Sequence, residues 1–340
     1  MSMRPADTGE GTSPEVDVMQ VRAWPSTDGG AERAHDPATD PAALAAYFKA
    51  EGFAVIRGAV PGALCAHAVR GFAEQVRPDR GYFMRHQSSD LERHVFTQHG
   101  FMKYPIMNVQ DLTERRFTRF RSACLDALTH PKLQQTVAAI LGEPARLIHT
   151  MYFDGNQTTW AHRDGSYIDA AGGQMIGLWL ALEDIHPGAG RFFVVPRSHV
   201  TAVPGERELA EKDPNGPAYK AAMARFVASG PLEVVAPALR QGDIIVWSSR
   251  TIHGSLPTTD PARSRKSLTG HYVGRSQKFG WQVQSPTSGR ATAFNDMPVV
   301  LHGQRNLRNL LRVKYVTPLR RRAKAALPWL HAALRGGKGG

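Results

Sequence analysis

The second half of the chain alternates between short apolar runs and clusters of turn-forming residues, and this pattern limits the possible folds most strongly. The runs are rich in β-branched and aromatic residues, and Gly, Pro, Asp and Ser separate them. Runs of this length and composition are typical of strands, since helices need longer periodic segments. They predict an antiparallel β-sandwich or barrel, with strands at RLIHTMYF (146–153), QMIGLWLAL (174–182), RFFVVP (191–196), LEVVAPAL (232–239), DIIVWS (243–248) and RKSLTGHYV (265–273).

Before residue 143 the apolar residues mostly follow helical spacing. A first helix is expected over 42–52, where Gly52 ends it, and the apolar run 53–58 that follows is typical of a strand. Further helices are expected over 62–76 and, in two pieces, over 112–142. Helices packed outside a sheet give a mainly β fold with flanking helices.

Two longer connections are candidates for functional loops, and the first of them is a candidate for a lid or a substrate wall. Residues 75–110 are mixed and aromatic, and they carry His86, His94 and His99 among charged residues. Residues 201–230 are polar, contain proline and have some helical character, and they are too long for a tight hairpin. Long connections inside a compact domain are often functional, although histidines are also common at protein surfaces.

Composition and charge divide the chain into three parts. Residues 1–40 are rich in Ala, Pro, Gly, Thr and Asp without periodicity, which predicts a disordered leader. A single catalytic domain is expected over 41–290, with its β core at about 143–275. Of the net charge of +12, ten positive charges lie in residues 297–340, which contain no acidic residue, so the remainder carries +2. The basicity belongs to a C-terminal tail.

The C-terminal tail mixes cations with leucines and Trp329, a composition that suits peripheral contact with an anionic membrane surface. A solvated, disordered tail is the alternative, because Pro318 and Pro328 interrupt any long helix. Nucleic acid is a disfavoured partner, since Tyr315 and Trp329 are the tail's only aromatic residues for base stacking.

The sequence favours the cytoplasm. No run approaches 18 uninterrupted apolar residues, so a membrane-spanning helix is not expected. Residues 1–20 lack the apolar core of a secretory signal. Cys65 and Cys124 are the only cysteines, and we expect them as buried free thiols in a reducing compartment.

The segment TTWAHRDGSYID holds a candidate metal site. Along an extended strand, side chains two apart project to the same face, so His162 and Asp164 can hold one ion while Arg163 points away. His253, in GDIIVWSSRTIHGS, ends a predicted strand 91 residues later, which is enough chain to return beside the first pair. Two imidazoles and one carboxylate form the facial triad of non-haem Fe(II) oxygenases and leave coordination positions open.

Other interpretations of these residues stay open on spacing alone. A surface strand that carries His-Arg-Asp by chance is the simplest, because short motifs often arise without function. A copper or manganese cupin is a second alternative, although such sites usually use more than one histidine in the first motif. Zinc-dependent hydrolysis is disfavoured, because the helical HExxH signature is missing from the sequence.

The order of motifs over about residues 42–275 resembles the phytanoyl-CoA dioxygenase family of Fe(II)- and 2-oxoglutarate-dependent oxygenases. The matching segments are KAEGFAVIRGAV, VQDLTERRFTRF, THPKL with LGEP, LIHTMYF, HRDG, LWLALED, GAGRFFVVPRSH, GDIIVWSSRTIHGS and RKSLTGHYV. The resemblance implies a double-stranded β-helix, a jelly-roll or cupin-like core, with Fe(II) on His162, Asp164 and His253. It also implies 2-oxoglutarate as cosubstrate and O2 as oxidant.

The resemblance further implies four residues around the cosubstrate. Arg265 is expected to hold the distal carboxylate of 2-oxoglutarate, because a guanidinium pairs with it in a bidentate manner, although Arg263 lies close in sequence. Ser255, two residues after the distal histidine, matches a hydroxyl contact to the same carboxylate. Trp179 matches a tryptophan beside 2-oxoglutarate, with a core aromatic as the alternative. Asn108 departs from the family pattern, since it stands where some relatives carry a cosubstrate-binding lysine.

The sequence thus predicts a 2-oxoglutarate-dependent dioxygenase that hydroxylates an unactivated C–H bond and releases succinate and CO2. Asp164 favours hydroxylation over halogenation, because halogenases of this architecture replace the carboxylate with Gly or Ala. Desaturation, epoxidation or cyclisation within the family, and a non-enzymatic β-sandwich that binds a ligand, are the alternatives. The substrate is expected to be a small molecule, a lipid-linked compound or a saccharide, and the sequence selects none of these.

Overall fold

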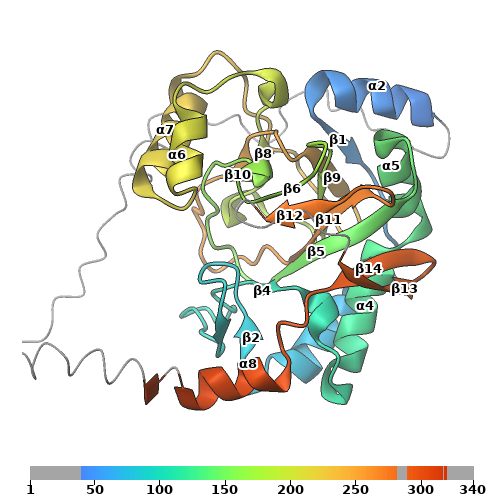
Figure 1. Ribbon diagram of the computed structural model, residues 1–340, viewed down its shortest axis with the longest axis vertical. Coiled ribbons are helices and arrows are strands. Elements are labelled where there is room, and N and C mark those ends of the chain that lie inside the picture. The colour runs from blue at the N-terminus through green and yellow to red at the C-terminus, as the bar shows by residue number, and fades with distance from the viewer. Residues whose placement is uncertain (1–39, 282–288, 317, 320–340) are drawn as a thin grey trace, which may run out of the picture.

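The computed structural model describes residues 40–281, 289–316 and 318–319 (Figure 1). The disordered leader predicted over 1–40 lies outside the described residues except for Asp40, which caps the first helix. The helices are α2 (Pro41–Glu51), α3 (Gly62–Gly71), α4 (Thr118–Leu128), α5 (Pro131–Leu141), α6 (Glu206–Lys212), α7 (Pro217–Ser229) and α8 (Leu307–Leu311). The strands are β1 (Phe53–Ile56), β2 (Phe83–Met84), β3 (Leu91–Glu92), β4 (Ile106–Met107), β5 (Ala145–Phe153), β6 (Ile168–Ala170), β7 (Ile176–Ala181), β8 (Phe192–Val194), β9 (Ile244–Ser248), β10 (His253–Ser255), β11 (Ser267–Gly274), β12 (Phe279–Trp281), β13 (Arg290–Phe294) and β14 (Met297–Leu301).

One large sheet organises the molecule. Its strands run in the order β1-β9-β7-β11-β5-β14-β13, with β4 added to β5, and every described pairing is antiparallel except that of β14 with β5. Because side chains alternate along a strand, β9 presents Ile244 and Val246 to one face and Ile245 and Trp247 to the other. Both faces are therefore apolar and both are covered.

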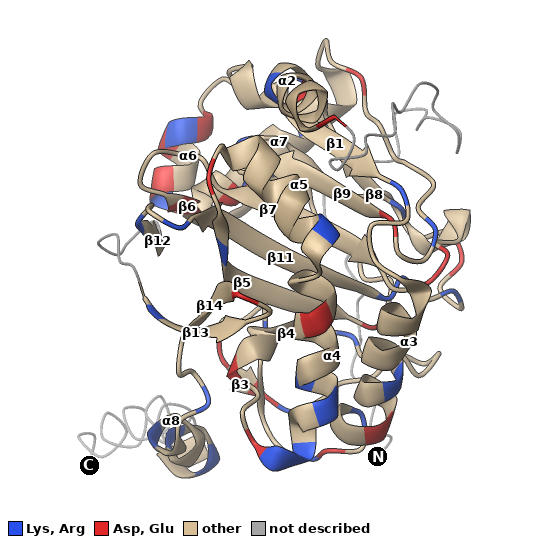
Figure 2. Ribbon diagram, turned by 90° about the vertical axis from the view of Figure 1, so that its right-hand side faces the viewer, with Lys and Arg blue, Asp and Glu red and all other residues tan. Residues whose placement is uncertain are grey.

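Helices α2, α3, α4 and α5 cover the outer face of this sheet, as Figure 2 shows for the last three. These are the helices expected from apolar spacing before residue 143, and that prediction is confirmed. The first begins where Asp40 accepts a 2.8 Å hydrogen bond from the Ala43 N–H, and it ends at Gly52, which takes a left-handed φ of 80°.

Short strands form a second layer against the inner face. Strand β8 pairs with β10, and β6 pairs with β12. Val194 of β8 packs in one cluster with Trp179 and Trp247 of the large sheet. The mainly β fold with flanking helices, built on a double-stranded β-helix, is therefore confirmed, and the space between its two layers is where the predicted metal ligands lie.

The strand predicted over 232–239 is wrong. Only Val235 pairs there, through a single bridge to Val194, and the rest of the segment is irregular. Pro231 and Pro237 enclose the bridge, and a proline has no N–H to donate to a neighbouring strand.

The sheet continues past the expected limits of 275 for the core and 290 for the domain. Strand β14, with Met297 and Val299 buried, lies between β5 and β13, so the segment predicted as a tail from residue 297 begins inside the sheet. Arg305 is also buried, 2.7 Å from Glu114. Among the described helices, none combines the length and apolar character required to span a bilayer.

Candidate metal centre and cosubstrate pocket

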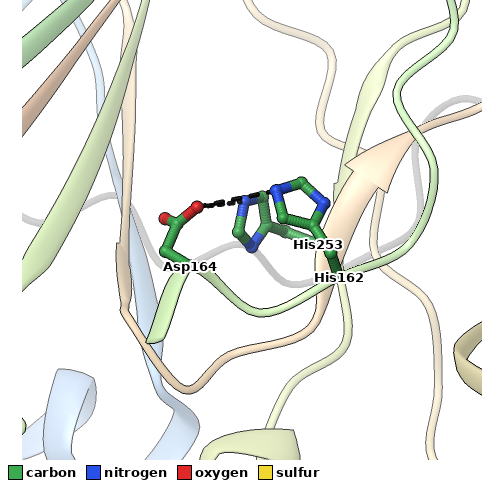
Figure 3. A group of neighbouring side chains, drawn as sticks. All are labelled: His162, Asp164 and His253. Atoms are coloured by element: carbon green, nitrogen blue, oxygen red, sulfur yellow. Dashed lines mark ion pairs between the residues drawn. The ribbon is translucent and has the colours of Figure 1, made fainter. Parts of the chain in front are cut away.

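His162, Asp164 and His253 converge on one point between the two layers (Figure 3). The Nε2 atoms of His162 and His253 each lie 3.5 Å from Oδ1 of Asp164, and the three possible ligand atoms all lie within 4.8 Å of one another. All three side chains are buried. The structure thus brings together the three residues that the sequence spacing singled out.

Backbone pairing sets the positions of these ligands. His162 and His253 form an isolated antiparallel bridge, with N···O distances of 3.0 Å in both directions. Arg163 is extended (φ −115°, ψ 132°), so His162 and Asp164 project to the same side as expected, although Asp164 begins a 3-10 turn, η4 (Asp164–Ser166), instead of continuing a strand. His253 opens strand β10 and does not end the preceding strand as predicted.

Hydrogen bonds to the backbone fix the tautomer of both histidines. His162 Nδ1 lies 2.8 Å from the carbonyl oxygen of Trp160, and His253 Nδ1 lies 2.9 Å from that of Thr251. Because a carbonyl oxygen only accepts, each Nδ1 carries the proton and each Nε2 keeps a lone pair for a metal. Burial, with His253 nearby, lowers the pKa of His162 and favours the neutral ring that metal binding requires.

Asp164 is oriented through its second oxygen. The Trp247 indole N–H donates to Oδ2 at 2.8 Å, and His271 Nε2 lies 3.2 Å from the same atom. Burial alone would raise the pKa of Asp164, but His253 and His271 hold it well below its ordinary value. The carboxylate is therefore ionised and directs Oδ1 at the two histidines.

This donor set fits Fe(II). Two neutral imidazole nitrogens and one carboxylate oxygen make up the facial triad of non-haem iron sites, and the backbone carbonyls, Trp247 and His271 supply the outer hydrogen bonds that such ligands usually have. The triad also lines a cavity, so a metal held there is open to ligands from that side.

The cavity measures about 340 Å³, a size suited to small organic ligands. Aromatic, apolar and histidine side chains form most of its wall, and Asp164 and Arg265 are the only charged side chains among the described residues that line it. The other residues of the wall include His86, Gln87, Ser89, Met107, His149, Met151, Phe153, Thr159, Trp160, Tyr167, Ile168, Trp179, Phe192, Pro214, Asn215, Trp247, Ser255, Thr269 and His271.

Arg265 is a buried cation with neutral partners. Its Nη1 donates to the carbonyl oxygen of Gly190, and its Nη2 donates to that of Gln157 at 2.6 Å. Burial lowers its pKa to about 10, and no acidic side chain of the described residues lies within ion-pair distance. Arg263, the alternative considered from the sequence, lies at the surface and pairs with Asp260 at 3.2 Å. Of the two, Arg265 alone faces the cavity, with a charge that an anion can neutralise.

Ser255 and Trp179 also line the cavity. Ser255 follows His253 along β10 on the same face, and its Oγ accepts a 2.8 Å hydrogen bond from the Thr159 N–H. Its hydroxyl hydrogen is thereby left to donate to a ligand. Trp179 packs beside Phe192 with ring centroids 5.8 Å apart, so it is both a core aromatic and a wall residue.

Asn108 is placed differently from the other predicted cosubstrate residues. It is buried behind His149, whose Nδ1 lies 2.6 Å from its Oδ1, and its amide donates to Gln304 at 2.7 Å. His149 lines the cavity, whereas Asn108 does not appear among the described wall residues. The structure therefore gives Asn108 contact with a wall histidine instead of direct contact with the cavity.

The three histidines of segment 75–110 separate in the structure. His86 lines the cavity, and burial, with His162 nearby, lowers its pKa to about 4. His94 lies behind the wall, between Arg85 and the carbonyl oxygen of Val76, at 2.9 Å from each. His99 is exposed. Only His86 fulfils the expectation that this segment contributes a histidine to the substrate wall.

Trp247 and His271 were not recognised from the sequence as supports of the metal site. One signal was available, namely Gly177 in the middle of a predicted strand. A Cβ atom at Gly177 would lie 2.2 Å from the ring of Trp247, so the glycine makes room for the indole. For His271, the alternation of side chains along β11 predicts which face of the sheet it lies on, but it does not predict the contact with Asp164.

Arg163 connects the insertion 201–230 to the segment 162–164, which carries two of the three metal ligands. Its side chain turns away from the cavity as predicted, pairs with Glu206 of α6 at 2.5 Å, and donates to the carbonyl oxygens of Ser198 and Thr201. The insertion in turn supplies Pro214 and Asn215 to the cavity wall. The segment that carries His162 and Asp164 is thus bonded to the insertion that forms part of the wall.

Non-haem iron, 2-oxoglutarate-dependent oxygenases are defined by a double-stranded β-helix in which two histidines and one carboxylate converge on one metal position. Phytanoyl-CoA dioxygenase (PhyH) is the family whose model matches residues 48–267, and the chain belongs to this family. It is accordingly a 2-oxoglutarate-dependent dioxygenase with Fe(II) as its metal.

Solved structures share the fold. One is SnoN, a non-heme alpha-ketoglutarate-dependent epimerase from nogalamycin biosynthesis. Its complex with Fe3+, alpha-ketoglutarate and nogalamycin RO is 18% identical, with a TM-score of 0.53 over 79% of this chain and 98% of that one. The carbocyclase SnoK of the same biosynthesis is 16% identical, with a TM-score of 0.53 over 74% of this chain and 90% of that one. No curated protein sequence matches the chain.

Proposed function

We propose that this oxygenase hydroxylates a C–H bond of an uncharged small molecule, with Fe(II) on His162, Asp164 and His253 and 2-oxoglutarate on Arg265 and Ser255. One observation carries the proposal: the convergent triad and a buried guanidinium, which has no acidic partner among the described residues, line the same cavity. A cation buried in this way is costly unless an anion joins it. A dicarboxylate that reaches from Arg265 to the metal meets both requirements.

The residues around the cavity have separate tasks in this reaction. Bound Fe(II) and 2-oxoglutarate supply the oxidising chemistry, in which one atom of O2 goes to succinate, the other goes to the substrate C–H bond, and CO2 is released. Arg265 and Ser255 hold the distal carboxylate and so orient the 2-oxo acid end toward the triad. Trp179 and Phe192 form an apolar wall that keeps water away.

Hydroxylation is the outcome that Asp164 supports. Its Oδ1 is the third possible ligand atom of the triad, at the position where a halogenase needs space for chloride, and Trp247 and His271 hold the carboxylate in place through Oδ2. Desaturation, epoxidation and cyclisation would use the same triad and differ in how the substrate lies.

An uncharged substrate is supported by the composition of the wall. Asp164 faces the metal position and Arg265 is assigned to the cosubstrate, so no charged side chain of the described wall is left for the substrate. Burying an unpaired charge against aromatic rings is strongly unfavourable. His86, which has no hydrogen-bond partner among the described residues, can instead bind a neutral hydroxyl or carbonyl group.

Succinate release tests the proposal. The Fe(II)-loaded full-length chain is given 2-oxoglutarate, O2 and a panel of matched uncharged and charged compounds. We expect uncharged compounds to stimulate succinate release and to gain one oxygen atom, and we expect Asp164→Ala to abolish both. Stimulation by carboxylates or phosphates alone would overturn the substrate class. Absence of any 2-oxoglutarate-dependent product from the whole panel would overturn the reaction.

We also propose the cytoplasm as the location and an anionic membrane surface as a partner of the basic C-terminal tail. Cys65 and Cys124 are buried free thiols, which supports a reducing compartment. The ten cations and missing acids of residues 297–340 support attraction to anionic lipid.

A further inference from the structure

Exposed apolar side chains gather near the end of the described chain. Of the eight large apolar side chains exposed in the described residues, five lie within residues 307–319. Four of these recur at every fourth position, namely Leu307, Leu311, Tyr315 and Leu319, with exposed fractions of 71%, 45%, 53% and 65%. Residues 307–311 form α8 and residues 312–316 continue it as the π-helix η7 (Arg312–Val316), so Leu307, Leu311 and Tyr315 lie close to one face and form an apolar stripe, here called the outer stripe. Leu319 lies beyond residue 317, which is outside the described residues, and is not counted in the stripe.

Packing against the body does not explain the outer stripe, because another face of the same segment does the packing. Val313 is buried in a cluster with Leu91 and Met84, and Leu310 packs against that cluster. Arg312 pairs with Asp90 at 3.4 Å. The segment therefore has an inner face fixed to β2 and β3, and an outer stripe that faces solvent.

Within the segment itself, the charged side chains beside the outer stripe are all cations, whereas Asp90 and Glu92 belong to β3 and its approach on the inner side. Arg308 and Lys314 are exposed beside it, and residues 297–340 as a whole contain ten cations and no acid. Figures 1 and 2 place α8 at one end of the molecule, far from α2, and Figure 2 shows the Lys and Arg positions on α8 in blue. An apolar stripe bordered by cations is the composition of helices that lie in an anionic membrane interface.

We infer that residues 307–316 dock on an anionic membrane surface, with the outer stripe among the acyl chains and Arg308 and Lys314 at the headgroups. A nucleic acid would use the cations but not the apolar stripe. The inference names the docking element of the proposed membrane contact, and it does not depend on the metal assignment.

Docking would bring the substrate cavity to the membrane. The inner face of the segment packs on β2 and β3, and the connection between these strands supplies His86, Gln87 and Ser89 to the cavity wall. One hairpin thus separates the outer stripe from the cavity. An uncharged substrate dissolved in the bilayer would have a short route into the cavity.

Vesicle flotation of the full-length chain tests the docking element. The probes are phosphatidylcholine vesicles with and without phosphatidylglycerol. The variants are Leu307→Gln with Leu311→Gln, Arg308→Gln with Lys314→Gln, and, as a control, Val200→Gln, which removes an apolar side chain that is 75% exposed elsewhere. All the variants exchange exposed residues, and far-UV circular dichroism of each confirms an intact fold. Anaerobic Fe(II) and 2-oxoglutarate binding is measured separately, as a test of the proposed function.

We expect the wild type to float with anionic vesicles only and to be released by salt. The double leucine variant should bind about tenfold or more weakly, the double cation variant about tenfold more weakly, and Val200→Gln should bind like wild type. Equal binding to both vesicle types, or unchanged binding of the double leucine variant, would overturn the inference. So would self-association that the leucine changes abolish, because a second copy would then cover the stripe. Vesicle binding without iron binding would reject the proposed function and leave the docking intact.

Discussion

The indole N–H of Trp247 donates a 2.8 Å hydrogen bond to Oδ2 of Asp164, the carboxylate oxygen that faces away from the two histidines. The bond joins the inner face of the large sheet to the 3-10 turn that carries Asp164. Because Oδ2 is held in this way, Oδ1 keeps its direction toward His162 and His253 before any metal arrives.

Replacing Trp247 with Phe should weaken Fe(II) binding by about 10- to 100-fold, since partners of this kind orient the ligand that binds the metal. Trp179→Phe is the matched control, because Trp179 lines the same cavity from the same face of the sheet. Anaerobic titration with Fe(II) alone measures the effect. Equal affinity in the two variants would show that the indole bond does not orient Asp164.

Arg265→Lys should weaken 2-oxoglutarate binding by about tenfold to a hundredfold, whereas Arg263→Lys should leave it unchanged. A lysine cannot reach two carbonyls and present a bidentate pair to a carboxylate at the same time. Arg263 pairs with Asp260 at the surface and makes a matched control. The measurement is 2-oxoglutarate affinity of the Fe(II)-loaded protein, and a larger loss at position 263 would reverse the assignment.

Glu206→Gln should lower the free energy of unfolding by about 3 kcal/mol, because it leaves the buried Arg163 guanidinium without its counter-charge. The side chains of that pair are 14% and 11% exposed. Those of Arg207 and Glu211, 90% and 61% exposed, form a surface pair, so Glu211→Gln should change stability by less than about 1 kcal/mol. Denaturant unfolding of the metal-free chain compares the two variants. Similar losses would mean that the insertion is not anchored through Arg163.

His86→Phe should separate cosubstrate binding from substrate turnover. His86 faces the cavity from the 85–90 connection and is assigned neither to the metal nor to 2-oxoglutarate, so affinities for both should stay within about twofold of wild type. Substrate-stimulated succinate release should fall by about tenfold as a neutral hydrogen bond is lost. His99→Phe, at an exposed position, is the control. Loss of iron binding in His86→Phe would place this residue in the metal site instead.

Acid should destabilise the metal-free chain below pH 6.5. Burial lowers the pKa of His94 to about 4 and that of His149 well below its ordinary value, so the unfolded chain takes up these protons first as the pH falls. Stability is therefore complete above about pH 6.5 and declines toward pH 4, by no more than about 1.4 kcal/mol per pH unit for each group. Unfolding of His94→Gln across this range should show a shallower decline. A slope identical to that of wild type would contradict the assignment to His94.

The metal site was predictable because its signal is local and chemical. His162 and Asp164, two residues apart, and His253 after a strand can be recognised in the sequence, and the alternation of side chains along an extended segment supplies their geometry. The choice between Arg263 and Arg265 depends on which of the two side chains is buried in the folded protein, and this is not visible in the sequence. Resemblance favoured Arg265, and burial beside Gly190 separates the two.

Some features of the fold and the site could not be predicted from sequence patterns. The bond from Trp247 to Asp164 joins residues 83 apart, and no local pattern encodes it. Strand β14 was missed because residues from 297 onward were assigned to a tail on their charge. Its run MPVVL is apolar, and it pairs with β13 at five positions and with β5 at one. The strand predicted over 232–239 failed because prolines outweighed its apolar composition.

Anaerobic titration of the full-length chain with Fe(II), followed by 2-oxoglutarate, tests the central claim most directly. One Fe(II) should bind per chain, and 2-oxoglutarate should then produce the visible charge-transfer absorption of its chelate. His162→Ala should lose both signals while remaining folded, and His99→Ala should retain both. Equal iron binding by wild type and His162→Ala would contradict the assignment of the metal to His162, Asp164 and His253.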